Sequence, residues 1–348
     1  ATPLHQKNTA EQHGGSSAGL GALSSREPGR GGQSVFGMGR MDLSIIVVNW
    51  NTRELLGKCL ASIATTVRRL SYEIIVVDNA STDGSQAMVR RQFPRVNIIE
   101  NSDNLGFACA NNQALRQVTT EYALLLNSDA LVTTGSVEAL MACATRHPDA
   151  GVCGAMLLNP DGSFQASYGS FPTLWSEFLH LFSIRTFFGD HSYPSVPLEK
   201  SIVDREVDWV GGACFLVRRK AWEAIGLLDE SYEMYGEELD WCLRMWQSGW
   251  KVRYCPDAQV IHLGGQSTRS IPLWKMQQIY KSKLRYFEKH SGLSSRRILT
   301  SMIRLSCLLK AGYSFLFKVF HPSSSAIKDW RLYWQIAWGK FSPSGRKP

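Results

Sequence analysis

Long apolar runs are absent from this chain, and so are the usual signals for export. No stretch of about 18 or more uninterrupted apolar residues occurs, so we expect no membrane-spanning helix. The N-terminus has no apolar core preceded by positive charge, which favours a cytoplasmic protein over a secreted one. No G-x-G-x-x-G follows the first predicted strand and no G-x-x-x-x-G-K is present, so neither a dinucleotide site nor a P-loop is indicated.

Paired cysteine motifs are missing as well. The eight cysteines include no C-x-x-C pair, and several stand inside apolar runs. We therefore expect buried free thiols in a reducing compartment, and neither a disulfide framework nor a zinc site. The cysteines are Cys59, Cys109, Cys143, Cys153, Cys214, Cys242, Cys255 and Cys307.

Acidic residues are scarce toward the C-terminus. The net charge is +8, and from Lys275 to Lys347 only Glu288 and Asp329 oppose the basic residues. At about 100° per residue, the segment 297–321 separates a basic arc from an apolar arc. The basic arc holds Arg304, Lys310, Lys318 and His321, and the apolar arc holds Ile298, Leu305, Leu308, Leu309, Leu316, Val319 and Phe320. Such a helix suits an anionic membrane surface, where the protein would be peripheral, and packing against the rest of the chain is the equal alternative.

The sequence divides into three parts. Residues 1–40 are rich in Gly, Ser and Gln and hold one aromatic residue, so we expect them to be disordered. From residue 41 to about 270, apolar strands such as 44–48 and 73–77 alternate with helical patterns such as 53–66 and 85–92. This alternation predicts an α/β domain with a mostly parallel sheet covered on both faces. Residues 271–348 are expected to form a helical C-terminal extension.

Polar clusters follow three of the predicted strands. They are Asn49–Asn51, Asp78–Asp83 and Asn127–Asp129. Ligands in open α/β sheets bind beyond the carboxyl ends of the strands. One such cluster would be explained by helix capping alone, but three on successive strands favour a binding site.

Six blocks of the sequence together resemble the family-two glycosyltransferases, whose Rossmann-like GT-A fold binds nucleotide sugars. The blocks are the first strand with Asp78–Ser85, then Asn104–Asn111, Asn127–Asp129, Gly211–Ala213, Glu237–Trp241 and His262–Ser267. They cover about residues 42–270 in the family's order, and the Asn104 and His262 blocks are most similar to the rhamnosyltransferase-type branch. The resemblance implies an inverting transferase that moves a sugar from a nucleotide-diphosphate donor to a cell-envelope glycan or glycolipid. Rhamnose from dTDP-rhamnose is the first candidate.

The donor site expected from this resemblance lies at the strand ends. A carboxylate at Asp78 can accept a hydrogen bond from a pyrimidine N–H or a ribose hydroxyl, and the resemblance implies the pyrimidine. Gly106 would allow close backbone approach in a nucleoside pocket, although a plain loop turn is the alternative for its block. The Gly211–Gly212 pair would let the backbone approach the donor sugar or diphosphate. The donor residues expected are Val48, Asn49, Asn51, Asp78, Asn104, Gly106, Asn111, Asn127, Gly211 and Gly212.

A hard divalent cation would offset the charge that develops on a departing diphosphate. The resemblance implies that Asp129 and His262 hold Mn²⁺ or Mg²⁺. The family's Asp-x-Asp motif is Asn127-Ser128-Asp129 here, so only Asp129 supplies a full charge. Asp129 ends a predicted strand, as the ligand role requires.

Inverting transfer also needs a general base that removes the acceptor's hydroxyl proton. Alignment with the family gives this role to Glu238, with Glu237 and Asp240 as alternatives, and an acid-rich first helical turn is the non-catalytic explanation. Trp209 and Trp241 would stack on an acceptor sugar or belong to the core.

Two other functions compete with this hypothesis. A nucleotidyltransferase that makes sugar nucleotides also needs strand-end carboxylates and a metal. Such an enzyme would normally have a glycine-rich loop after the first strand. Residues 49–53 contain no glycine, which argues against this function. A non-catalytic protein that binds a membrane surface is the second alternative, and the ordered series of carboxylates argues against it. Basic and aromatic residues do not interleave in the first half, so we expect no nucleic-acid partner.

Overall fold

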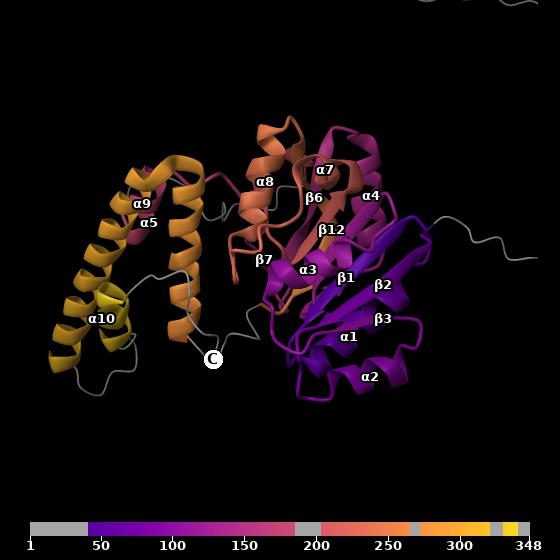
Figure 1. Cartoon of the computed structure of the whole chain (residues 1–348), viewed down its shortest axis with the longest axis horizontal. Helices are drawn as coiled ribbons and strands as arrows, with labels where there is room; N and C mark the ends of the chain where they lie inside the picture. Colours follow the sequence, from indigo (N-terminus) through magenta and orange to yellow (C-terminus); the bar gives the residue numbers. More distant parts are fainter. Residues whose placement is uncertain (1–40, 185–202, 265–271, 321–329, 340–348) are drawn as a thin grey trace, which may run out of the picture. The chain divides into compact units, whose positions relative to one another are not determined.

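The computed structural model describes residues 41–184, 203–264, 272–320 and 330–339. The predicted disorder of residues 1–40, the part of the His262–Ser267 block beyond Gly264, and His321 of the basic arc lie outside these ranges. Within them, a mixed sheet of ten strands has the order β3-β2-β1-β4-β11-β6-β12-β5, with β7 paired to β6 and β9 paired to β12. β1, β2 and β3 lie side by side in it (Figure 1). Two short strands, β8 and β10, pair with each other.

The elements follow one another along the chain with these bounds. The strands are β1 (Leu43–Asn49), β2 (Tyr72–Asp78), β3 (Asn97–Glu100), β4 (Tyr122–Asn127), β5 (Ala130–Val132), β6 (Ala150–Leu158), β7 (Phe164–Gln165), β8 (Tyr168–Gly169), β9 (Arg205–Glu206), β10 (Trp209–Val210), β11 (Cys214–Arg218) and β12 (Lys251–His262). The helices are α1 (Arg53–Thr66), α2 (Ser85–Gln92), α3 (Phe107–Leu115), α4 (Ser136–Arg146), α5 (Leu174–Leu181), α7 (Arg219–Ile225), α8 (Glu237–Gln247), α9 (Pro272–Phe320) and α10 (Trp330–Trp338).

The first half of the chain forms most of the parallel part of the sheet. β1 lies between β2 and β4 and is parallel to both, with Asn49 opposite Asp78 and Val48 opposite Asn127. The polar residues that follow these strands therefore meet at one edge of the sheet. The helices predicted at 53–66 and 85–92 are confirmed as α1 and α2.

The second half departs from a purely parallel arrangement. β11 is antiparallel to both of its neighbours, β4 and β6. β12 is parallel to β6 but antiparallel to β5, so that His262 lies opposite Ala130. The segments 251–255 and 259–262 belong to one strand, β12, because a register shift between Cys255 and Gln259 absorbs the irregular segment between them. The sequence pattern did not indicate β6, whose apolar run is interrupted by Gly151 and Gly154.

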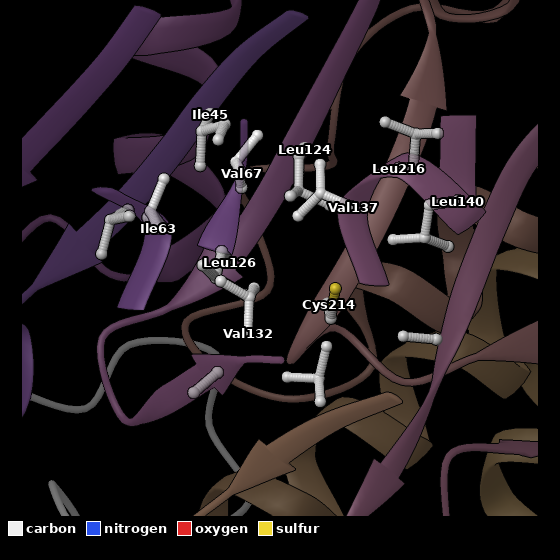
Figure 2. Packing of buried hydrophobic residues seen from close by; sticks show 14 of the residues in the cluster. Ile45, Ile63, Val67, Leu124, Leu126, Val132, Val137, Leu140, Cys214 and Leu216 are labelled. Carbon is white, nitrogen blue, oxygen red and sulfur yellow. The ribbon is translucent and has the colours of Figure 1, made fainter. Parts of the chain in front are cut away.

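Both faces of the sheet are buried. Ile45 of β1 belongs to the core cluster that includes residues of α1 and α4 (Figure 2). Its neighbour Ile46 points to the other face and belongs to the cluster that includes residues of α3, α7 and α8. Coverage on both faces confirms the predicted α/β class and explains why the strands are apolar throughout.

The C-terminal helices form a third cluster of buried residues. α9 is interrupted at Gly292, whose φ of 84° is a conformation that glycine tolerates best. The cluster includes Leu181, Leu299, Ile303, Cys307 and Ile336. Nζ of Lys283 in α9 lies 2.6 Å from Oε2 of buried Glu177 in α5. Among the described helices, none has both the length and the apolar character that crossing a bilayer requires.

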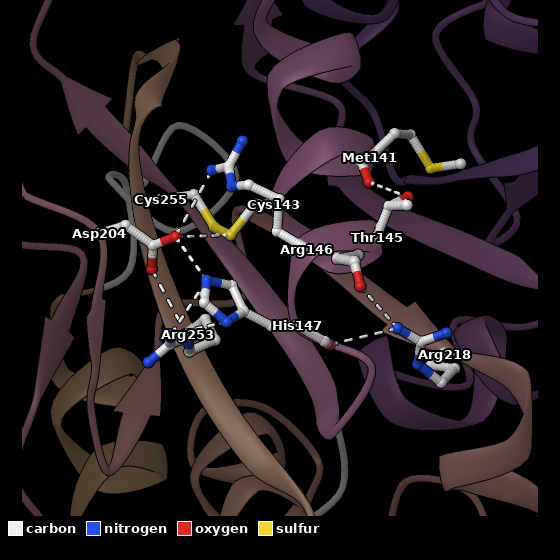
Figure 3. The surroundings of a disulfide bond; sticks show 10 residues. Met141, Cys143, Thr145, Arg146, His147, Asp204, Arg218, Arg253 and Cys255 are labelled. Carbon is white, nitrogen blue, oxygen red and sulfur yellow. Dashed lines mark hydrogen bonds and ion pairs between the residues drawn. A yellow bond between two sulfur atoms is a disulfide. The ribbon is translucent and has the colours of Figure 1, made fainter.

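The cysteine prediction was wrong for two residues. Cys143 of α4 and Cys255 of β12 form a disulfide, with their Cα atoms 6.6 Å apart (Figure 3). Because 112 residues separate them in the sequence, spacing gave no sign that α4 packs on β12 at this point. Five others are buried thiols, as expected: Cys59, Cys153, Cys214, Cys242 and Cys307.

Candidate active site

A cavity of about 400 Å³ lies where the polar strand ends converge. The strands contribute Val48 and Asn127 at the ends of β1 and β4, and His262 at the end of β12. The loop between β10 and β11 contributes glycines, and the first turn of α8 contributes carboxylates. Eleven of the predicted site residues line the cavity: Val48, Asn104, Gly106, Asn127, Asp129, Trp209, Gly211, Gly212, Glu237, Glu238 and His262.

Asp129 and His262 lie side by side in this cavity. Nε2 of His262 is 3.3 Å from Oδ1 of Asp129 and 3.4 Å from Nδ2 of Asn127. Both Asp129 and His262 are largely buried, with side-chain exposures of 11% and 14%. The sheet holds them there, since the backbone N–H of Leu263 donates to the Asp129 carbonyl at 3.0 Å.

Gln165 fixes the orientation of the His262 ring. Its amide nitrogen donates to the His262 carbonyl at 3.1 Å and to Oδ1 of Asn159 at 2.9 Å, so its amide oxygen is the group that faces Nδ1, at 2.6 Å. Nδ1 must then carry a hydrogen, and in the neutral ring Nε2 keeps a lone pair directed toward Asp129. A histidine held in this way, beside a carboxylate, can bind a divalent cation through Nε2.

Two adjacent carboxylates begin α8 and face the same cavity. Gly236 precedes the helix with a φ of 85°, and its N–H donates to Oε2 of Glu238 at 3.1 Å. Oε2 of Glu237 is buried and has no hydrogen-bond partner among the described residues. Burial raises the pKa of Glu237, and the neighbouring charge of Glu238 raises it further. Burial also raises the pKa of Glu238. A carboxylate with a raised pKa is suited to removing a proton near neutral pH.

Asp240 has a different environment from the two glutamates. It is fully buried outside the cavity, where it contacts Arg244 at 2.9 Å, Lys289 at 2.7 Å and His290 at 2.8 Å. Burial alone would raise the pKa of Asp240, but the hydrogen bonds from His290 and Lys289 and the charge of Arg244 outweigh it and lower the pKa. Asp240 therefore links α8 to α9 as a stable anion, and the structure does not bring it to the cavity.

Asp78 lies behind the cavity wall instead of in it. It is completely buried, and Oδ2 accepts a hydrogen bond from Nδ2 of Asn49 at 2.7 Å. Oδ1 accepts from the backbone N–H of Ser81 at 2.9 Å and from Nε2 of Gln86 at 2.6 Å. The next residue, Asn79, is the one that lines the cavity. Asp78 thus shapes the loop that presents Asn79.

Four other predicted residues also lie away from the cavity: Asn49, which is buried and donates to Asp78, and Asn51, Asn111 and Trp241. Oδ1 of Asn51 accepts from the backbone N–H of Thr82, and Nδ2 of Asn111 donates to the Phe107 carbonyl. Trp241 is fully buried, stacked on Phe215, so the core interpretation holds for it. Trp209 lines the cavity.

Sequence reasoning missed several lining residues. They are Trp50, Asn79, Phe107, Gln165, Glu233, Met234, Tyr235 and Trp274. Trp50 and Asn79 stand inside clusters that were singled out, so their position offered a signal. Gln165 and Trp274 lie in segments whose position at the cavity no local pattern reveals.

Comparisons with known proteins show the family of this chain. Residues 44–226 match the model described as Glycosyl transferase family 2. The chain is 30% identical over 266 residues to N-acetylglucosaminyl-diphospho-decaprenol L-rhamnosyltransferase of Mycobacterium tuberculosis, across 72% of this chain and 85% of that protein.

Two solved structures share the fold at low sequence identity. One is mannosyltransferase PcManGT from Pyrobaculum calidifontis in complex with GDP-Man and Mn²⁺, with a TM-score of 0.50 at 16% identity, covering 86% of this chain and 87% of that one. The other is GalNAc-T7 with UDP, GalNAc and Mn²⁺, with a TM-score of 0.52 at 15% identity, covering 72% of this chain and 48% of that one. At these identities they establish the GT-A fold alone.

The glutamate pair should make the protein less stable as the pH rises. Between the ordinary glutamate pKa of about 4.3 and the raised values, the folded state binds more protons than the unfolded state, so the free energy of unfolding falls. Urea unfolding across this window should show the fall in the wild type and a smaller one in Glu237→Gln. The exposed Glu223→Gln is the matched control. An unchanged pH dependence in Glu237→Gln would contradict the raised pKa.

Proposed function

The chain belongs to glycosyl transferase family 2, and we propose that it transfers rhamnose from a nucleotide-diphosphate donor to a lipid-linked cell-envelope glycan, with inversion at the anomeric carbon. The mycobacterial relative is named for rhamnosyl transfer to N-acetylglucosaminyl-diphospho-decaprenol, which supports this sugar and this class of acceptor. The observation that carries the proposal is that one cavity is lined by the glutamate pair, by Gly212 and by the Asp129–His262 pair.

The proposed reaction is a single displacement. Glu238 removes the proton of the acceptor hydroxyl while that oxygen attacks the anomeric carbon of the donor sugar. The bond between this carbon and the diphosphate oxygen breaks, and the nucleotide diphosphate leaves. The side chain of Glu238 lies along Gly212, where an added Cβ would be 3.8 Å from the Glu238 Cβ, so the base stands beside backbone that a sugar can approach. Glu237 keeps a second carboxyl close to the base.

Asp129 and His262 would hold Mn²⁺ or Mg²⁺, and the bound cation would offset the negative charge of the leaving diphosphate. The fit rests on the ring orientation set by Gln165, which places the lone pair of Nε2 of His262 beside a carboxylate. The nucleoside would occupy the end lined by Asn79, Asn104, Gly106 and Phe107. Trp209 would face the acceptor.

The proposal is tested with the full chain, Mn²⁺ and a panel of dTDP-, UDP- and GDP-sugars. One donor, dTDP-rhamnose first, should raise the Tm in a metal-dependent way in both the wild type and Glu238→Gln. Transfer to an N-acetylglucosaminyl-diphospho-lipid analogue should fall by roughly 10²–10⁴-fold in Glu238→Gln and remain normal in the control Glu223→Gln. Retained turnover in Glu238→Gln would remove its role as base, and the absence of any donor shift would contradict the class of substrate.

We also propose that α9 and α10 attach the protein to an anionic membrane surface. One face of α9 packs inside the protein through Leu299, Ile303 and Cys307. The predicted apolar arc is a different face, and six of its seven residues are at least 50% exposed: Ile298, Leu305, Leu309, Leu316, Val319 and Phe320. Trp338 of α10 is also mostly exposed.

Charge favours a lipid surface as the partner of this apolar face. From Leu293 to Phe320 the chain has five basic residues and no acidic one. Arg297, Arg304 and Lys318 are exposed on the same helix as the apolar face. Apolar side chains next to basic ones are the combination that binds anionic bilayers. A lipid-linked acceptor would be presented at such a surface.

Flotation with vesicles tests this attachment. The wild type should bind phosphatidylcholine vesicles that contain phosphatidylglycerol, and binding should weaken with salt. Leu309→Glu/Leu316→Glu should lower the partition coefficient by roughly tenfold or more, since each leucine loses a burial energy of about 1.5–3 kcal/mol. Gln92→Glu/Asn97→Glu makes the same charge change on exposed positions of α2 and β3 and should bind normally. Equal binding of the two variants would argue against the proposed face.

A further inference from the structure

Three cysteines, from three separate elements, meet in the core behind the sheet. Cys143 comes from α4, Cys153 from β6 and Cys255 from β12, and none is more than 2% exposed. Their Sγ atoms all lie within 4.8 Å of one another. In a tetrahedral zinc site with Zn–S bonds of about 2.3 Å, sulfur atoms are about 3.8 Å apart. The trio therefore needs only small side-chain adjustments to surround one ion.

A disulfide accounts for only part of this arrangement. It uses Cys143 and Cys255 but leaves the Cys153 thiol beside them. Asp204 adjoins one member of the trio, with Oδ2 3.5 Å from the Sγ of Cys143 (Figure 3), and together with Cys143 and His147 it forms a second group of possible ligands. Nε2 of His147 lies 3.0 Å from the same carboxylate oxygen. Three sulfurs and one carboxylate are four groups that can each bind zinc, which is the number that a tetrahedral site takes, and His147 contacts the carboxylate.

The surrounding charges fit a bound dication. Three thiolates and one carboxylate around Zn²⁺ leave two negative charges. The guanidinium groups of Arg146 and Arg253 lie 3.5 and 3.6 Å from Asp204 and offset them. Without a metal, burial raises the pKa of Cys153 to about 12, and the charge of Asp204 contributes. The Cys153 thiol is then neutral, so a metal would replace its proton.

We propose that reduced Cys143, Cys153 and Cys255, together with Asp204, form a structural zinc site that is separate from the transfer site. Opening the Cys143–Cys255 bond takes two electrons and two protons from a dithiol reductant, which is itself oxidised to a disulfide. Zn²⁺ then displaces the three thiol protons. The bound ion ties α4 and β6 to β12, the strand whose far end carries His262.

The metal content of the full chain, purified with a dithiol reductant and without chelator, tests this site. The wild type and Cys109→Ser, a cysteine outside the trio, should each contain one zinc ion per chain. Cys153→Ser should lose the zinc, although it leaves both partners of the disulfide in place. Zinc that is retained in Cys153→Ser, or a wild type that contains none, would overturn the proposal.

Measurements on the wild type alone keep the test valid if Cys153→Ser does not fold. Removing the metal with a chelator under reducing conditions should lower the Tm, and added Zn²⁺ should restore it. Co²⁺ in its place should give a thiolate-to-metal charge-transfer band. Absence of that band, with the Cys143–Cys255 disulfide recovered by peptide mapping under the same conditions, would show that the trio serves only as a disulfide.

Discussion

The candidate active site depends on the pairing of β12 with β5. This short antiparallel contact sets His262 opposite Ala130 and joins the Leu263 N–H to the Asp129 carbonyl. β5 immediately follows the end of β4, so the pairing brings a histidine from late in the chain to the carboxyl end of an early parallel strand. Without it, the Asp129 carboxylate would have no imidazole beside it.

The first turn of α8 has two roles, because successive helical residues point in different directions. Glu237 and Glu238 face the cavity, where burial raises the pKa of each carboxyl. Asp240 points away from the cavity into a cationic cluster with Arg244, Lys289 and His290, which lowers its pKa. One acid-rich turn therefore supplies both a carboxyl suited to proton transfer and an anion that anchors α9.

Much of the catalytic domain could be predicted from the sequence, because its signals are local. The stripe of Leu56, Cys59, Leu60 and Ile63 marks α1, and the strand-end clusters mark the edge where the site forms. Features that depend on packing between residues far apart in the sequence could not be predicted. No local pattern could show that Asp78 turns into a network with Asn49, or that Trp241 stacks on Phe215. Likewise, Cys143 meets Cys255 only after α4 has packed on β12. Gln165 contacts His262 only after their two strands have come together.

The configuration of the transferred sugar tests the central claim most directly. The enzyme would transfer rhamnose from dTDP-β-L-rhamnose to an N-acetylglucosaminyl-diphospho-lipid analogue. NMR of the product would then give the configuration at the anomeric carbon of the transferred rhamnose. A single displacement with Glu238 as base predicts that the rhamnose is α-linked, because attack occurs opposite the leaving diphosphate. A β-linked product would contradict this account, since retention requires a different arrangement of groups around the donor.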